Sequence, residues 1–404
     1  MPDNPTLDEL QREEYELRQE LGRIERALTS ADPDDLDELL SRRIAVQARL
    51  DAVLALMQAA TPPTKGVITR SARKSETGVD IRVGMDYVPT SVYHLVDPAE
   101  SALVIATVDK KSAAARSAPA TVSITSYIEG YSARKVDVVT REMVKSTEVR
   151  QSPTLLPDRV KTITELTPAT LHVEVHDFTS GTKIDHITRT VWLLARNSVT
   201  TAVRDPDTGA VTDLSRYLGA YVTPNAPAVM HFLRKVADYH PQHKLAGYQP
   251  GAPVEDQVRA VFDALKNETK VVYVNSLVDF NPQEGSQSQR IRLPREALDE
   301  RQANCVDGTV LVASLLEAIS LTPAIVLVPK HAFVGWQVDK DEKSAWNYLE
   351  TTLIDSGDFQ QAVDYAGRLA ATYEKQATTT GNPAWFRRLS LRDLRTTDRI
   401  WPME

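Results

Sequence analysis

The stretch Asn304-Cys305-Val306-Asp307-Gly308 lies where a polar turn gives way to the apolar run Thr309–Ile319. Asn304 is a suitable helix N-cap, and Asp307, three positions later, can bond back to the capping residue. A helix is therefore predicted to begin at Cys305, the only cysteine of the chain. The positive end of a helix favours a thiolate. A lone cysteine is more often a small buried hydrophobe, so its interpretation depends on the residues that follow.

The residues after this helix predict three strands that bring a histidine and a carboxylate together. Short apolar or alternating runs indicate strands at 324–328, 333–338 and 345–354, with a charged turn at 339–344. If that turn pairs Val338 with Ala345, Glu350 becomes a diagonal neighbour of His331 on one sheet face. A slip of one residue would place them on opposite faces. In the favourable register, Cys305, His331 and Glu350 form a nucleophile, a base and an orienting group.

This order resembles the transglutaminase-like superfamily of cysteine peptidases, a branch of the papain-like fold. The family pattern has a cysteine opening a helix, a strand with Gly-His-Ala, and a strand ending in Asp-Pro-Thr. The resemblance covers roughly residues 221–354 and implies that Cys305 is the nucleophile, His331 the general base and Glu350 the third member. Two departures occur: Lys330 replaces the common glycine, and Glu-Thr-Thr replaces Asp-Pro-Thr.

The same resemblance implies a role for an aromatic residue upstream of the nucleophile. In this family such a residue often supplies a donor to the oxyanion. Tyr273, 305 − 273 = 32 residues before Cys305, is similar in placement. Packing of Tyr273 in the core is the alternative. The backbone N–H of Cys305 is the other expected donor, because the first amides of a helix have no intrahelical partner.

Composition limits the remaining classes of function. Lys plus Arg number 47 and Asp plus Glu 55, so the net charge of −8 argues against general binding of nucleic acid or anionic membranes. A single cysteine excludes an intramolecular disulfide and fits a reducing compartment. No run is apolar for long enough to span a membrane, and the N-terminus lacks a signal-peptide core. These features predict a cytoplasmic protein without metal or cofactor.

The length of 404 residues suggests two or three domains, and the pattern divides the chain into four parts. Residues 1–60 show heptad spacing and predict an antiparallel helical hairpin, a coiled coil that either packs on its own chain or mediates self-association or partner docking. Residues 61–78 read as a linker. Residues 79–204 predict an immunoglobulin-like antiparallel β-sandwich, and residues 205–404 the transglutaminase-like α+β domain.

One motif in the expected sandwich has the residue types of a metal site. His172 and His176 flank Glu174 on one face of a strand. No further ligand pattern lies nearby, so a solvated strand face is the preferred interpretation.

The function expected from these residues is a thiol protease or amidase that cleaves a protein or peptide through a Cys305-His331-Glu350 triad and a thioester. A transglutaminase or deamidase acting on Gln side chains is the first alternative, because an amine can replace water as acceptor. A catalytically silent interaction scaffold is the second. The best argument for the scaffold is that Lys330 and Glu350 both depart from the family pattern.

Overall fold

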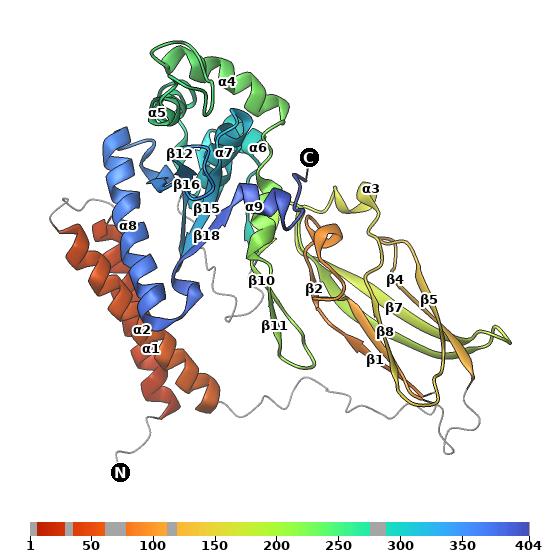
Figure 1. The fold of residues 1–404 in the computed structure, drawn as a ribbon. Coiled ribbons are helices and arrows are strands. Elements are labelled where there is room, and N and C mark those ends of the chain that lie inside the picture. The colour runs from red at the N-terminus through yellow and green to blue at the C-terminus, as the bar shows by residue number, and fades with distance from the viewer. Residues whose placement is uncertain (1–5, 29–34, 61–77, 111–118, 275–287, 404) are drawn as a thin grey trace. The chain divides into compact units, whose positions relative to one another are not determined.

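The chain is a mixed α+β protein with several antiparallel sheets (Figure 1). The computed structural model describes residues 6–28, 35–60, 78–110, 119–274 and 288–403. It divides into two compact units, Met1–Ser71 and Ala72–Glu404. The expected linker, 61–78, lies outside the described residues except for Gly78. None of the described helices is both long and apolar enough to cross a bilayer.

The first unit contains the two expected helices, α1 (Leu7–Leu28) and α2 (Leu36–Ala60), packed on each other. The ion pairs Glu20–Arg42 (2.7 Å) and Glu13–Arg49 (2.6 Å) show that the helices run antiparallel. Such exposed pairs each contribute at most about 1 kcal/mol, so apolar burial holds the pair together. Among the side chains that the structure describes in these two helices, the buried apolar ones are Leu10, Leu21, Ile24, Val46, Leu50 and Val53.

Residues 79–193 form two β-sheets that share one hydrophobic core. The sheet orders are β1-β3-β6 and β2-β8-β7-β4-β5. Pairing is antiparallel throughout, except that β2 lies parallel to β8, where the sequence predicted only antiparallel pairs. The exception arises because the chain leaves β1 through Gly84, crosses to the other sheet and meets its edge there. Bounds are β1 Val79–Val83, β2 Tyr87–Val88, β3 Val104–Val108, β4 Thr121–Ile128, β5 Lys135–Thr140, β6 Thr147–Gln151, α3 Pro157–Val160, β7 Thr167–Asp177 and β8 Lys183–Leu193.

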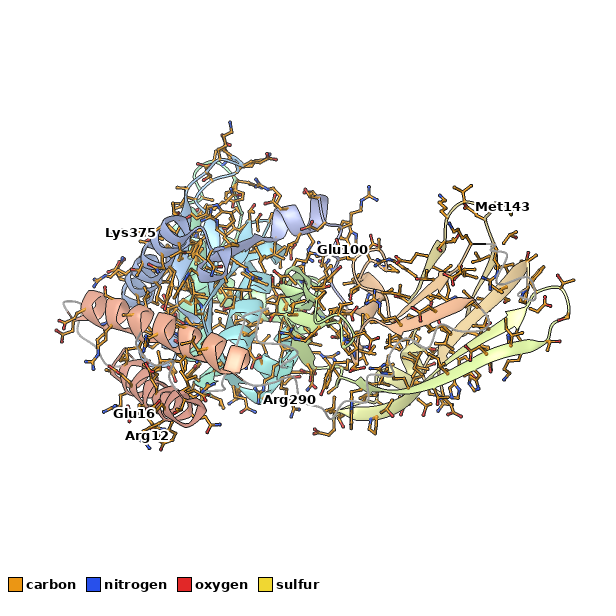
Figure 2. All side chains as sticks on the ribbon, turned by 90° about the horizontal axis from the view of Figure 1, so that it is seen from below. Arg12, Glu16, Glu100, Met143, Arg290 and Lys375 are labelled. Atoms are coloured by element: carbon orange, nitrogen blue, oxygen red, sulfur yellow. The ribbon has the colours of Figure 1, made fainter. Side chains whose placement is uncertain are left out.

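A packed junction joins this two-sheet region to the rest of the second unit. Tyr93 of η1 (Tyr93–Leu95) belongs to the two-sheet core, whereas its neighbour Val92 belongs to the larger core that follows. Two ion pairs, Arg82–Asp205 and Glu100–Arg216, connect the regions; Figure 2 labels Glu100. Both regions are thereby built into one unit.

The larger core surrounds α7 (Cys305–Ala318) and a four-stranded antiparallel sheet of order β17-β16-β15-β18. Helix α7 packs on β15 and β16, and α8 lies against β17. A helix that is apolar on all sides is stable only when surrounded, which agrees with the burial of α7 residues from Cys305 to Leu316. Bounds are β15 Pro323–Val328, β16 His331–Gln337, β17 Trp346–Leu349, η5 Thr351–Leu353, α8 Phe359–Thr380, η6 Pro383–Trp385, β18 Arg387–Ser390 and α9 Leu391–Thr396.

The segment between the two cores supplies three helices and short strands around α7. Strand β9 pairs with β13, β10 with β11, and β12 lies parallel to β14. Helices α4, α5 and α6 all contact α7. Bounds are β9 Ser198–Thr200, β10 Ala202–Arg204, β11 Val211–Asp213, η3 Ser215–Tyr221, α4 Pro227–Tyr239, α5 Val254–Ala264, the π-helix η4 Leu265–Thr269, β12 Val272–Tyr273, β13 Ser288–Arg290, α6 Pro294–Glu300 and β14 Gln302–Ala303.

A buried arginine ties together the strand ends at one end of the two-sheet region. Arg141 is 4% exposed and donates to the carbonyl oxygens of Pro119 (2.8 Å), Gly78 (2.8 Å) and Asp109 (3.0 Å). A guanidinium can reach three acceptors at once because its donors form a rigid fork. Arg141 therefore links three backbone positions: where the chain enters β1, where it leaves β3 and where it enters β4.

We expect Arg141→Ala to lower the free energy of unfolding by roughly 2–4 kcal/mol, because buried carbonyl groups lose their donors. Urea denaturation followed by circular dichroism measures the change. Arg134→Ala is the matched control. That arginine lies in the same region but its side chain is 56% exposed, so the expected loss stays below about 1 kcal/mol. Equal losses in the two variants would show that the buried fork has no special role.

Candidate active site

Cys305 is the first residue of α7, and its neighbours determine where that helix begins. Asn304 Oδ1 accepts a hydrogen bond from the Asp307 N–H at 2.8 Å, and Asp307 Oδ2 accepts one from the Asn304 N–H at 3.1 Å. This reciprocal pair is the predicted capping box, which is confirmed. The thiol thus lies in the first helical turn, at the positive end of the helix dipole. The cysteine is only 2% exposed.

The capping carboxylate of Asp307 has an arginine partner that no sequence pattern predicted. Asp307 is fully buried and accepts from the Arg292 backbone N–H at 2.8 Å and from Arg292 Nη1 at 3.1 Å. Burial raises the pKa of Asp307, and its hydrogen bonds to Arg292 and Asn304 oppose that rise. Arg292 also bonds Glu300 at 2.8 Å. Fifteen positions separate Arg292 from Asp307, a spacing without a local pattern to reveal the pair.

The register of the sheet is the one predicted. Val338 N–H donates to the Ala345 carbonyl at 3.0 Å, and Val334 pairs with Leu349. Continuing this register places Glu350 diagonally from His331. His331 Nε2 and Glu350 Oε2 are 2.7 Å apart. The structure therefore brings the expected base and carboxylate into direct hydrogen-bond contact.

Glu350 differs from the prediction in its local structure, because it lies one residue beyond β17 rather than inside a strand. It is the N-cap of η5, where its Oε1 accepts from the backbone N–H of Thr352 at 3.0 Å and from the Thr352 hydroxyl at 2.8 Å. These bonds pull the chain into a 3₁₀ turn and end the strand. They also use the carboxylate oxygen that does not contact His331, so the Glu350 side chain is fixed at both oxygens.

The turn after Glu350 approaches the first turn of α7 at Gly308. A Cβ built on Gly308 would lie 2.7 Å from the Thr351 Oγ1, closer than real Cβ atoms come, and 3.0 Å from the Thr351 Cβ, a tight contact. Any other residue at position 308 would therefore force Thr351 to shift. The contact carries the Glu350 turn toward the helix that begins at Cys305.

His331 interacts with both of the other expected members of the triad. Burial lowers the pKa of His331, but the negative charge of Glu350 and side-chain hydrogen bonds with Cys305 and Glu350 raise it to about 10. Nε2 is engaged by Glu350, so Nδ1 is the ring nitrogen that remains for the thiol. The histidine side chain is 20% exposed and that of Glu350 is 1% exposed. Glu350 thereby stabilises the protonated imidazole beside the sulfur.

Tyr273 lies on β12, which runs parallel to β14, with Tyr273 opposite Ala303. Its backbone is therefore beside the residues that lead into Cys305. The Tyr273 N–H donates to Asp355 Oδ2 at 3.3 Å, a contact that sequence reasoning missed. The part of Tyr273 in binding an oxyanion stays a prediction.

The departure at Lys330 has a conformational consequence. Pro329 and Lys330 form the turn between β15 and β16, in which Val328 pairs with His331. Lys330 has a φ of 61°, in the left-handed region that favours glycine. The residue before the histidine thus adopts the backbone shape that glycine accepts best, and lysine holds it under strain.

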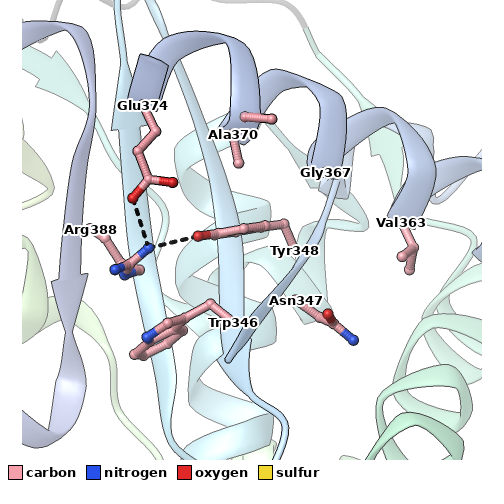
Figure 3. Close-up of a pocket in the computed structure, with 9 residues that line it drawn as sticks. Trp346, Asn347, Tyr348, Val363, Gly367, Ala370, Glu374 and Arg388 are labelled. Carbon is pink, nitrogen blue, oxygen red and sulfur yellow. Dashed lines mark hydrogen bonds and ion pairs between the residues drawn. The ribbon is translucent and has the colours of Figure 1, made fainter. Parts of the chain in front are cut away.

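A separate pocket of about 380 Å³ lies between α8 and the strands β17 and β18 (Figure 3). Within it, Arg388 donates to the Tyr348 hydroxyl at 2.7 Å and lies 3.6 Å from Glu374. Tyr348 pairs with Gly335, four residues beyond His331, or about 13 Å along the strand. Cys305 and Glu350 do not line this pocket, which is distinct from the candidate active site.

The His172, Glu174 and His176 motif is engaged by neighbouring side chains. Glu174 Oε2 pairs with Arg134 at 3.1 Å, and His172 Nδ1 is 3.0 Å from His186 Nε2. Among the described residues, no group of three or more His, Cys, Asp or Glu side chains is placed to hold a metal ion.

Comparison of the chain with protein-family models, curated proteins and solved structures gives no significant match.

The raised pKa of His331 predicts a pH-dependent contribution to stability. A pKa of about 10 in the folded protein, against 6.5 ordinarily, means that the contribution is full below about pH 6.5 and is lost as the pH rises through about 10. We expect the stability difference between wild type and Glu350→Gln to shrink over this range in urea denaturation. Glu374→Gln, which affects an exposed pair, should give a difference that is constant with pH. A constant difference for Glu350→Gln would contradict the assignment.

Replacing Lys330 with glycine should relieve the left-handed strain and raise the free energy of unfolding by about 0.5–1 kcal/mol. Lys330→Ala is the control, because alanine removes the same side chain but keeps the Cβ that causes the strain. Thermal denaturation of both variants tests the prediction. Equal melting temperatures for the two variants would show that backbone strain is not the cause.

Proposed function

We propose that the chain is a cysteine-dependent acyl-transfer enzyme of the transglutaminase-like type, acting as a protease or amidase. The observation that carries this proposal is the 2.7 Å contact between His331 and Glu350, with Cys305 as the other partner of the imidazole. A structural core needs none of these three residues in contact. In the same proposal, residues 205–404 are a papain-like domain, residues 79–204 an immunoglobulin-like sandwich, and residues 1–60 a coiled coil that recruits a partner.

The first half of the reaction forms a thioester. His331 Nδ1 takes the proton of the Cys305 thiol, and Glu350 holds the ring and stabilises the imidazolium. The thiolate attacks an amide carbonyl carbon and forms a C–S bond while the carbonyl electrons move to oxygen. The Cys305 N–H, at the start of α7, and Tyr273 donate to that oxyanion. As the C–N bond breaks, the imidazolium gives its proton to the leaving amine.

The second half releases the acyl group. Water attacks the thioester carbonyl, His331 accepts its proton, and the Cys305 sulfur leaves and is reprotonated, giving a carboxylic acid. The His331 side chain is 20% exposed, so solvent reaches the base that activates the water. We favour water as the acceptor because solvent reaches His331. An amine in place of water would produce transamidation by the same steps.

A catalytically silent scaffold is the second candidate, and the burial of the thiol favours it. With Cys305 only 2% exposed, a substrate carbonyl reaches the sulfur only if neighbouring residues move. On this view, the three residues form a buried polar cluster that stabilises the fold. Reactivity of the thiol separates the two candidates, since a static buried cluster protects the sulfur.

We expect iodoacetamide to alkylate wild-type Cys305 rapidly well below pH 8, because the imidazolium stabilises the thiolate. His331→Ala should slow alkylation at pH 6–7 by at least about tenfold, and Glu350→Gln should slow it less. Mass spectrometry of the alkylated protein measures the rates, and Cys305→Ala sets the background. Slow labelling that does not depend on His331 would favour the scaffold. Peptide amide hydrolysis that Cys305→Ala abolishes would complete the test.

A further inference from the structure

A buried carboxylate shares the first turn of α7 with the candidate nucleophile, where its charge would oppose thiolate formation. Asp307 is fully buried, two residues from Cys305, and accepts from the backbone N–H of Asn304, the residue before the cysteine, at 3.1 Å. A carboxylate there stabilises the helix start. The same negative charge disfavours a second negative charge on the neighbouring sulfur, because buried charges are screened weakly by solvent.

Arg292 is placed to cancel that charge. Its backbone N–H bonds one Asp307 oxygen at 2.8 Å, and Nη1 bonds the other at 3.1 Å. The arginine side chain is 19% exposed, and its outer partner Glu300 is 45% exposed and thus better screened by water. Because both its backbone N–H and its guanidinium bond the carboxylate, Arg292 is fixed in position relative to Asp307.

The other charged groups near the helix start belong to neighbouring elements. His331 of β16 is bonded to Glu350 at 2.7 Å, and the charge of Glu350 is balanced when that imidazole is protonated. Asp355, after η5, bonds the Tyr273 N–H. Among these groups, Asp307 is the carboxylate that bonds Asn304, the N-cap residue of α7. Arg292 is its ion-pair partner.

We propose that Arg292 is a positioning residue for the acyl-transfer site: it neutralises Asp307 and so permits a thiolate at Cys305. This inference rests on the proposed function. Arg292 does not touch the sulfur and acts through Asp307. The arrangement lets one carboxylate cap the helix without suppressing the charge that the nucleophile needs.

The test is a charge cycle in the full-length protein, read by the pH dependence of Cys305 alkylation with iodoacetamide. Arg292→Gln leaves Asp307 uncompensated and should raise the midpoint of the rate profile by about one pH unit, a roughly tenfold slower reaction below the midpoint. Asp307→Asn removes the buried negative charge, leaves Arg292 paired with Glu300 alone, and should lower the midpoint. The one acceptor oxygen of asparagine can keep the bond from the Asn304 N–H, while the bond from the Arg292 backbone N–H is lost. The double variant should return close to wild type.

Two further variants separate charge from folding. Arg292→Lys keeps the charge and should keep the wild-type midpoint even if the melting temperature falls. Arg295→Gln removes an arginine of α6 whose side chain is 50% exposed, and should change neither quantity. A midpoint that stays unchanged in both single variants, or that shifts in the same direction in both, would overturn the inference.

The outcome of this cycle is distinct from that of the proposed function. If the wild-type profile ignores His331→Ala, the proposed triad fails. The opposite shifts in Arg292→Gln and Asp307→Asn can still occur, because they need only the charges at the first turn of α7. If His331→Ala has its expected effect and the cycle shows no opposite shifts, the triad stands and the role of Arg292 fails.

Discussion

The register of the β16–β17 hairpin is the constraint on which the candidate site depends. Side chains alternate between the two faces of a sheet, so a shift of one residue would separate His331 from Glu350. The charged turn closes with the Val338–Ala345 bond, and the apolar residues of β16 hold the register because they face the core around α7. The 2.7 Å contact is therefore a consequence of how a remote turn closes.

Helix α7 depends on a second constraint, close packing of two chain segments. Gly308 lets the η5 turn, which follows Glu350, approach the first turn of α7 closely. The cap at Asn304 fixes the helix start from the other side. Register, cap and close approach together bring His331 against Glu350 and place Cys305 at the start of the helix that packs on β16.

Burial makes the electrostatics of this region strong. Glu350 and Asp307 are both carboxylates with almost no solvent contact, and each has one basic partner, His331 and Arg292 respectively. In a region of low dielectric, an unpaired carboxylate would be costly, so the two pairs are needed for stability as well as for any chemistry. The same burial leaves Cys305 little exposed, which is why reactivity rather than geometry must separate an enzyme from a scaffold.

The sequence alone determined the features that arise from short-range patterns. These are the capped helix from Cys305, the three strands after it, and the paired helices α1 and α2, because caps, turns and periodicity act over a few residues. The hairpin register was predicted only on the condition that Val338 pairs with Ala345. Only the tertiary structure decided the contacts between distant segments. Arg292 reaches Asp307 across a helix and a strand, β18 joins the sheet beside β15, and Glu350 lies beyond its predicted strand and caps η5. Such contacts depend on how whole elements pack, and no local pattern encodes the distances between them.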